Sequence, residues 1–190
     1  MPPYVCRRFG VLDAMILVAA IAAGLAAIRG IMPYGFNPLI IFDNDGPVRL
    51  QAKMVFSWIN SSLPVAAALT VSLVPLRLLR PRPPARRVCR EPGFVASVAA
   101  SSVTLGGLLW SIPAIAATNN TFIDCLSFAF SPFMAPLYAG WAVAGAWALL
   151  FWGGRWKPQP HWLDRAGRIA GGFWIGWIAA SLVERRLLDL

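Results

Sequence analysis

The sequence predicts an all-α membrane protein, a bundle of four or five transmembrane helices that forms one domain over residues 1–190. The chain is 58% hydrophobic and its mean hydropathy is +0.62. Only 13% of its residues are charged, against about a quarter in an ordinary soluble domain. Five apolar stretches alternate with short linkers, and about 20 apolar residues are enough to cross a bilayer. These stretches leave no room for a sizeable soluble domain.

The first apolar stretch, 11–28, follows Arg7 and Arg8. A basic pair before a short apolar run also fits a signal peptide, with a small-residue cleavage site at 24–26. The length of the stretch and the further spans behind it favour an uncleaved helix.

The second stretch, 54–79, contains two prolines, and Asn60 with two serines precedes the first of them, Pro64. A proline leaves a helix carbonyl unpaired, and nearby hydroxyl groups can satisfy it. A broken helix at a transport site is the alternative interpretation.

The linker after 79 alternates arginine with proline, so we expect it to be stiff and extended. Its arginines are predicted to bind anionic lipid head groups, each contributing on the order of 1 kcal/mol. A role in membrane topology alone would also account for them. The residues are Arg80, Arg82, Arg86 and Arg87.

The third stretch, 94–118, places Ser97, Ser101 and Thr104 on one helix face. Such hydroxyls commonly bond to carbonyls of their own helix, and a polar lane through a pore is the alternative. The fourth stretch is 134–152. The fifth, 166–183, has only 15 uninterrupted uncharged residues, 169–183, so an interfacial or re-entrant helix competes with a full span.

Twelve of the 17 basic residues lie before the first stretch, between the second and third, or between the fourth and fifth, if Arg77 and Arg168 just inside the neighbouring stretches are counted with them. Cytoplasmic loops are enriched in Lys and Arg, so the N-terminus is predicted to be cytoplasmic. Tryptophans at 152, 156 and 162 suit an interfacial belt. Those at 141, 147, 174 and 177 are predicted to pack between helices.

Small residues recur four apart near the end of the chain, where close helix approach is expected because lipid supplies no hydrophobic drive for association. Gly172, Gly176 and Ala180 are the candidates. They predict association with a membrane-protein partner or a second copy, or packing within the chain.

Asp13 lies about three residues into the first stretch. An intramembrane carboxylate is a functional candidate by default. Near a helix start it can instead interact favourably with the helix N-terminus or pair with Arg7 or Arg8.

Nothing in the sequence predicts a catalytic, cofactor or metal site. His161 is the only histidine, the three cysteines are far apart, and no nucleotide, hydrolase or metalloprotease motif occurs. The acidic turn at 43–46 lacks the glutamate that a calcium loop requires, since position 54 is Met54. The net charge of +9 lies in short loops, so membrane topology and lipid explain it better than nucleic acid does.

The segment RRFGVLDAMILVAA, residues 7–20, resembles the start of a group of small bacterial multi-pass membrane proteins. In that group an Arg-Phe pair precedes an Asp and an alanine-rich span. The resemblance implies a bacterial cytoplasmic (inner) membrane and assigns no activity and no role to Asp13.

The leading functional hypothesis is a non-catalytic subunit or scaffold of a membrane complex, and the alternative is a small transporter or channel. An enzyme is disfavoured because no catalytic constellation is present.

Overall fold

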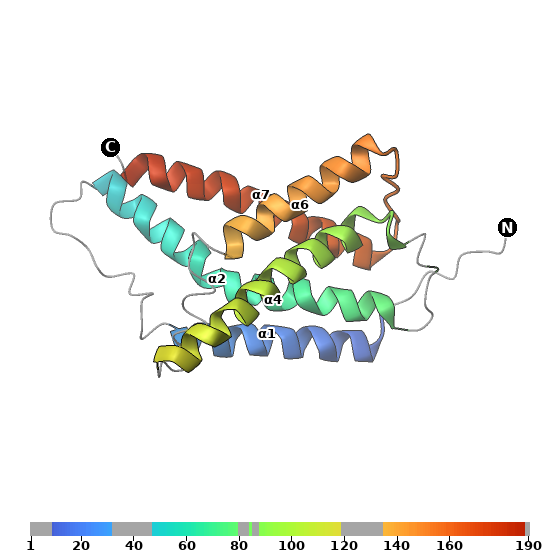
Figure 1. Ribbon diagram of the computed structural model, residues 1–190, viewed down its shortest axis with the longest axis horizontal. Coiled ribbons are helices and arrows are strands. Elements are labelled where there is room, and N and C mark those ends of the chain that lie inside the picture. The colour runs from blue at the N-terminus through green and yellow to red at the C-terminus, as the bar shows by residue number, and fades with distance from the viewer. Residues whose placement is uncertain (1–8, 32–46, 80–83, 85–87, 119–134, 189–190) are drawn as a thin grey trace.

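The computed structural model describes residues 9–31, 47–79, 84, 88–118 and 135–188, and this part of the chain is helical without strands. The helices are α1 (Val11–Ile31), α2 (Pro47–Leu78), α4 (Pro92–Thr118), α6 (Ala135–Trp152) and α7 (Trp162–Leu188). The chain direction alternates along the bundle, so α1, α4 and α7 begin at the end where α2 and α6 finish (Figure 1). The predicted helical bundle is confirmed.

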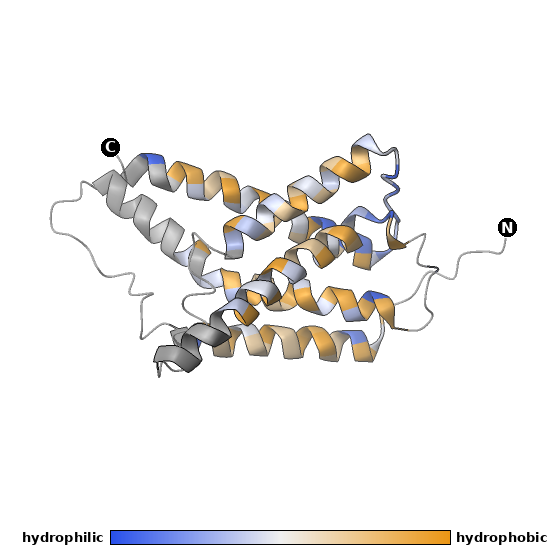
Figure 2. Cartoon of the chain, viewed as in Figure 1, coloured by the Kyte–Doolittle hydropathy of each residue, from blue (hydrophilic) through white to orange (hydrophobic). Residues whose placement is uncertain are grey.

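Four of the helices are long and apolar enough to cross a membrane: α1, α2, α4 and α7. The fifth predicted stretch, for which an interfacial helix competed with a full span, lies in α7, a continuous helix whose candidate span covers Trp162–Val183. The shorter apolar helix is α6, at Pro136–Trp152. Figure 2 shows apolar residues along the middle of the bundle, with hydrophilic residues gathered at the end where α4 and α7 begin.

Three helices begin earlier than the apolar pattern predicted. Helix α2 begins at Pro47 rather than 54, α4 at Pro92 rather than 94, and α7 at Trp162 rather than 166. Proline suits the first helical position because its missing N–H has no helical partner there. The first turns of α2 and α7 contain polar residues, so hydropathy alone places these two helix starts too late.

The core lies where α2, α4, α6 and α7 meet. Buried alanines let the helices approach closely around the side chains of Trp174 and Trp177, which are 1% and 2% exposed. These two tryptophans pack between helices as predicted. The prediction was wrong for Trp141, which is 58% exposed on α6.

Helix α1 packs along α2 at the edge of the bundle. Gly24 permits this contact, because a Cβ atom there would lie 2.6 Å from the Cα atom of Val65. The residue is small because the two backbones nearly touch.

Candidate functional site

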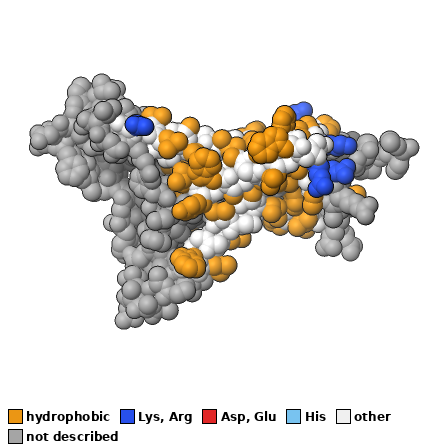
Figure 3. Space-filling model, turned by 45° about the horizontal axis from the view of Figure 1, so that its top comes forward, with side chains coloured by type: hydrophobic (Ala, Val, Ile, Leu, Met, Phe, Trp, Pro, Cys, Tyr) orange, Lys and Arg blue, Asp and Glu red, His pale blue; other side chains and the backbone are white. Residues whose placement is uncertain are grey.

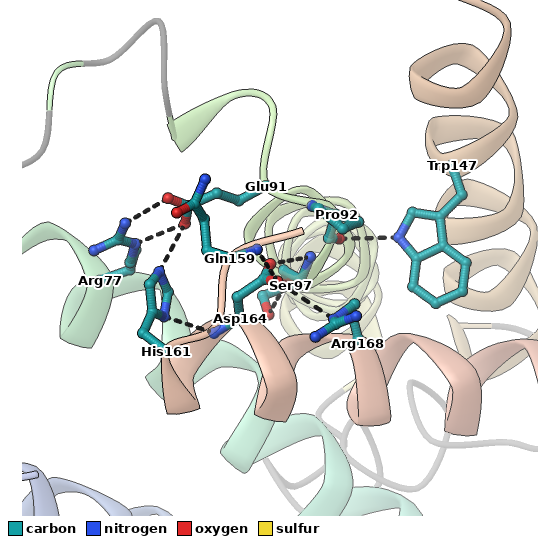
Figure 4. A network of polar contacts seen from close by, with 10 residues as sticks. Arg77, Glu91, Pro92, Ser97, Trp147, Gln159, His161, Asp164 and Arg168 are labelled. Atoms are coloured by element: carbon teal, nitrogen blue, oxygen red, sulfur yellow. Dashed lines mark hydrogen bonds and ion pairs between the residues drawn. The ribbon is translucent and has the colours of Figure 1, made fainter. Parts of the chain in front are cut away.

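A buried polar network joins the helices at the end where α4 and α7 begin (Figure 4). Its carboxylates are Glu91 and Asp164, each 1% exposed. Glu91 immediately precedes α4, and Asp164 lies in the first turn of α7. An ionised carboxylate is costly to bury unless it is paired and hydrogen-bonded, and both of these groups are.

Glu91 is held by the guanidinium of Arg77, which lies in the last turn of α2. Arg77 Nε donates to Oε2 at 2.8 Å and Nη2 donates to Oε1 at 2.5 Å. This bidentate geometry is the strong form of an arginine–carboxylate pair. It fastens the end of α2 to the start of α4.

His161 lies on the other side of Glu91 and caps α7. Its Nδ1 accepts a bond from the backbone N–H of Asp164 at 3.1 Å, the third residue of the helix. A neutral ring that accepts at Nδ1 carries its proton on Nε2, and Nε2 lies 3.5 Å from Glu91 Oε2. That separation is longer than a good hydrogen bond, so the contact is chiefly electrostatic.

The surroundings of Glu91 act on its pKa in opposite directions. Burial raises the pKa, whereas the His161 imidazole and the hydrogen bonds and positive charge of the Arg77 guanidinium lower it, and the net effect is a pKa below the ordinary value of 4.5. Glu91 is therefore a stable anion at neutral pH and is poorly suited to carry a proton there.

Asp164 belongs to α7, but it caps α4. Its Oδ1 accepts the backbone N–H of Gly93 at 2.9 Å, and its Oδ2 accepts that of Gln159 at 3.0 Å. Arg168 Nε lies 3.3 Å from Oδ2. The carboxylate satisfies a first-turn donor of α4 that has no helical partner, and its charge favours that helix N-terminus.

Glycines allow the two helix starts to meet backbone to backbone. A Cβ atom on Gly167 would lie 2.6 Å from the carbonyl carbon of Gly93, and one on Gly93 would lie 2.8 Å from the carbonyl carbon of Asp164. Trp147 of α6 adds a bond from Nε1 to the carbonyl of Pro92 at 2.9 Å. The network therefore connects α2, α4, α6 and α7.

A cavity of about 10 Å³ lies inside the network, roughly the space of one water molecule. Its walls include both carboxylates and Ser97. Within the described residues no group of three or more His, Cys, Asp or Glu side chains is placed to hold a metal ion.

The serines predicted on α4 are buried, as is Thr104. Ser97 Oγ donates to the carbonyl of Gly93 and Thr104 Oγ1 to that of Ala100, both at 2.9 Å. These are the bonds within one helix that the sequence favoured over a pore. Ser101 Oγ, in contrast, is buried without a hydrogen-bond partner in the described structure.

Asp13 is 2% exposed, and its Oδ2 accepts the backbone N–H of Gly10 at 3.1 Å. It therefore interacts with the start of α1, as expected for an acid near a helix N-terminus. Asn60 lies in α2, but its side chain is outside the described residues. The linker arginines proposed for lipid, at 80, 82, 86 and 87, also lie outside them.

The small residues of α7 divide between two faces. Gly167 and Gly171 are buried against other helices, and a Cβ atom on Gly171 would lie 2.7 Å from the ring of Trp147. Gly172 and Gly176 are exposed and have no neighbour within 4 Å of a Cβ position, while Ala180 is half-buried. The first pair serves packing within the chain, and the second pair does not.

The network was not predicted from the sequence, although Ser97 and His161 were each considered there as separate residues. A local signal was present, since Glu91 precedes a proline suited to begin a helix, and Asp164 follows at the third position of another. Acidic residues in a first turn indicate capping.

No protein-family model, curated protein or solved structure matches the chain. Four apolar helices of membrane-spanning length, packed in an all-helical bundle, define the class as a multi-pass membrane protein.

Proposed function

We propose that this protein is a non-catalytic subunit or scaffold of a membrane complex, and that α7 provides the docking face. The observation that carries the proposal is the open space at Gly172 and Gly176, where a Cβ atom would meet nothing within 4 Å. Small residues on a lipid-facing helix let a second helix approach closely.

The shape of this face supports helix docking. Ile169 and Val183 are 74% and 52% exposed, and the two glycines lie between them on the same side. The exposed positions 165, 169, 172, 176, 179 and 183 alternate in spacings of four and three, which is the spacing of a helix–helix seam. This face of α7 is low at the two glycines and higher at the bulkier residues on either side. Another transmembrane helix fits against the low centre.

The polar interior also favours a scaffold. The carboxylates of Asp13 and Asp164 accept backbone N–H groups at helix starts. That of Glu91 is paired with Arg77. Ser97 and Thr104 bond to their own helix. Polar groups committed to bonds of this kind maintain the bundle and are not available to a substrate.

The test is native mass determination of the full chain in lipid nanodiscs or mild detergent, comparing Gly172→Leu and Gly176→Leu with the parent protein. Gly145→Leu on α6 is a matched control, since that glycine also has nothing within 4 Å. We expect the α7 substitutions to reduce a dimer or a stoichiometric complex, and the control to keep it. A monodisperse monomer without a partner would contradict the proposal.

A small transporter is the second candidate, and the buried, unpartnered Ser101 Oγ favours it. Ser101 lies one turn from Ser97, which lines the cavity beside Glu91 and Asp164. This hypothesis expects Ser101→Leu or Asp13→Asn to change a solute or ion flux in proteoliposomes. If neither variant alters any flux, transport is excluded.

A further inference from the structure

The charges at the end of the bundle where α4 and α7 begin are separated by sign. All three acidic side chains that the structure describes, Asp13, Glu91 and Asp164, are at most 2% exposed and lie at this end. Four basic side chains there are exposed: Arg90, Arg155, Lys157 and Arg165. Figure 3 shows Lys and Arg side chains gathered at this end of the face in view, without an acidic side chain among them. The surface charge is therefore positive and has no exposed carboxylate beside it in the described part of the chain.

The backbone between α6 and α7 is fixed at several points. Lys157 donates its backbone N–H to the carbonyl of Arg90 at 3.1 Å, and Arg155 donates its own to that of Leu150 at 3.0 Å. The ring of Trp156 packs edge-on against that of Trp147 at 5.5 Å. The backbones of Arg90 and Lys157 are therefore hydrogen-bonded neighbours, and less backbone conformational entropy is lost on binding than from a loose loop.

Exposed aromatic residues end helix α6 on the side of these basic residues. Helix α6 ends at Phe151 and Trp152, which are 72% and 81% exposed. Exposed aromatic rings at the end of an apolar helix are typical of the membrane interface. Arg155 follows three residues later, just outside the hydrocarbon layer, where phosphate groups lie.

The geometry points to a binding site for an anionic phospholipid head group on a basic rim formed by Arg90, Arg155 and Lys157. The basic side chains of the rim pair with the negatively charged phosphodiester of the lipid. Trp152 contacts the part of the acyl chains next to the head group. Each Arg or Lys near an anionic lipid surface raises the binding affinity by about fivefold. The site is independent of the docking face proposed for α7.

The test measures lipid binding to the full chain by native mass spectrometry in a mild detergent. Phosphatidylglycerol is compared with phosphatidylcholine of the same acyl chains, and inorganic phosphate is added as a competitor in a third arm. The variant is Arg155→Gln/Lys157→Gln. The matched control is Arg29→Gln/Arg186→Gln, which removes the same charge from exposed residues at the other end of the bundle.

We expect phosphatidylglycerol to bind more tightly than phosphatidylcholine, and the variant to weaken that binding by about 25-fold, at about fivefold for each charge. The control is expected to keep its affinity. Equal affinity for the two lipids, or equal loss in the control, would overturn the proposal. Full displacement by millimolar inorganic phosphate would assign the site to free phosphate instead. The single variant Lys157→Gln, with about a fivefold loss expected, serves if the double variant does not fold.

Discussion

Gly93 and Gly167 hold the first turn of α4 and the second turn of α7 so close that neither position accommodates a side chain. The Gly167→Ala methyl group would lie 2.6 Å from the carbonyl carbon of Gly93, and backbone cannot rotate away as a flexible side chain can. We expect this substitution to lower the unfolding temperature in detergent, at a cost of about 1 to 3 kcal/mol, which is typical of overpacking.

Gly172→Ala is the matched control on the same helix, because a methyl group there meets nothing within 4 Å. Alanine is a better helix former than glycine by about 1 kcal/mol, so this variant should be as stable as the parent or more so. Equal destabilisation by both substitutions would show that the approach of the two backbones does not limit the choice of residue.

Asp164→Asn tests the cap that α7 provides to α4. The carboxylate accepts backbone N–H groups on both oxygens, from Gly93 and Gln159, whereas an amide has one oxygen. One buried donor is left without an acceptor, which costs about 1 to 3 kcal/mol. Thermal unfolding should show the loss, together with faster amide exchange at the start of α4.

Arg168→Gln separates the caps from the ion pair. It removes the charge beside Asp164 Oδ2, but leaves both backbone bonds in place, and the Arg168 side chain is 35% exposed. Part of the guanidinium reaches solvent, although the Nε atom beside Asp164 is buried. We expect a smaller loss of stability than for Asp164→Asn, because both backbone N–H groups keep their acceptor. If Arg168→Gln is as harmful as Asp164→Asn, the ion pair and not the capping dominates.

Glu91 makes stability depend on pH in a defined direction. Its pKa in the folded protein lies below the ordinary value of 4.5, so the folded state favours the anion. The resulting stabilisation is fully present above pH 4.5 and is lost as the pH falls from there through the lower folded pKa. The unfolding temperature should therefore drop in acid.

The variant Arg77→Gln/Glu91→Gln identifies the contribution of Glu91. Removing both charges avoids leaving a buried, uncompensated arginine, which alone costs about 3 to 5 kcal/mol. The acid-dependent drop in unfolding temperature should be smaller in this variant than in the parent. An unchanged drop would assign the dependence to other carboxylates.

Cys89 tests the predicted orientation of the chain. It is exposed at the end of the bundle where α4 begins, which the distribution of basic residues predicts to be cytoplasmic. With Cys6 and Cys125 replaced by serine, a membrane-impermeant maleimide should label inverted vesicles and not intact cells. Labelling only in intact cells would reverse the orientation.

Hydropathy predicted where the apolar centres of the helices lie, because each residue of a spanning stretch must be stable in lipid and this requirement is visible residue by residue. It did not predict the starts at Pro47 or Trp162, since hydropathy does not register polar helical turns. The first turn of α7 is capped by His161, which no hydropathy value reports.

The network around Glu91 and Asp164 depends on residues distant in sequence, and no periodicity encodes which helix ends meet. The two faces of α7 differ in packing and not in composition, since both carry glycines, and only the face of Gly171 contacts other described helices.

The cap on α4 comes from a residue 71 positions further along the chain. A ribosome therefore releases α4 well before it has made the carboxylate that completes its first turn. Until then the backbone N–H of Gly93 lacks the acceptor that Asp164 supplies, and the end of α2 and the start of α4 are joined through Arg77 and Glu91. Once α7 is made, Asp164 caps α4 and α7 packs against α2, α4 and α6. The packing of the bundle is therefore completed by the last of the described helices to be translated.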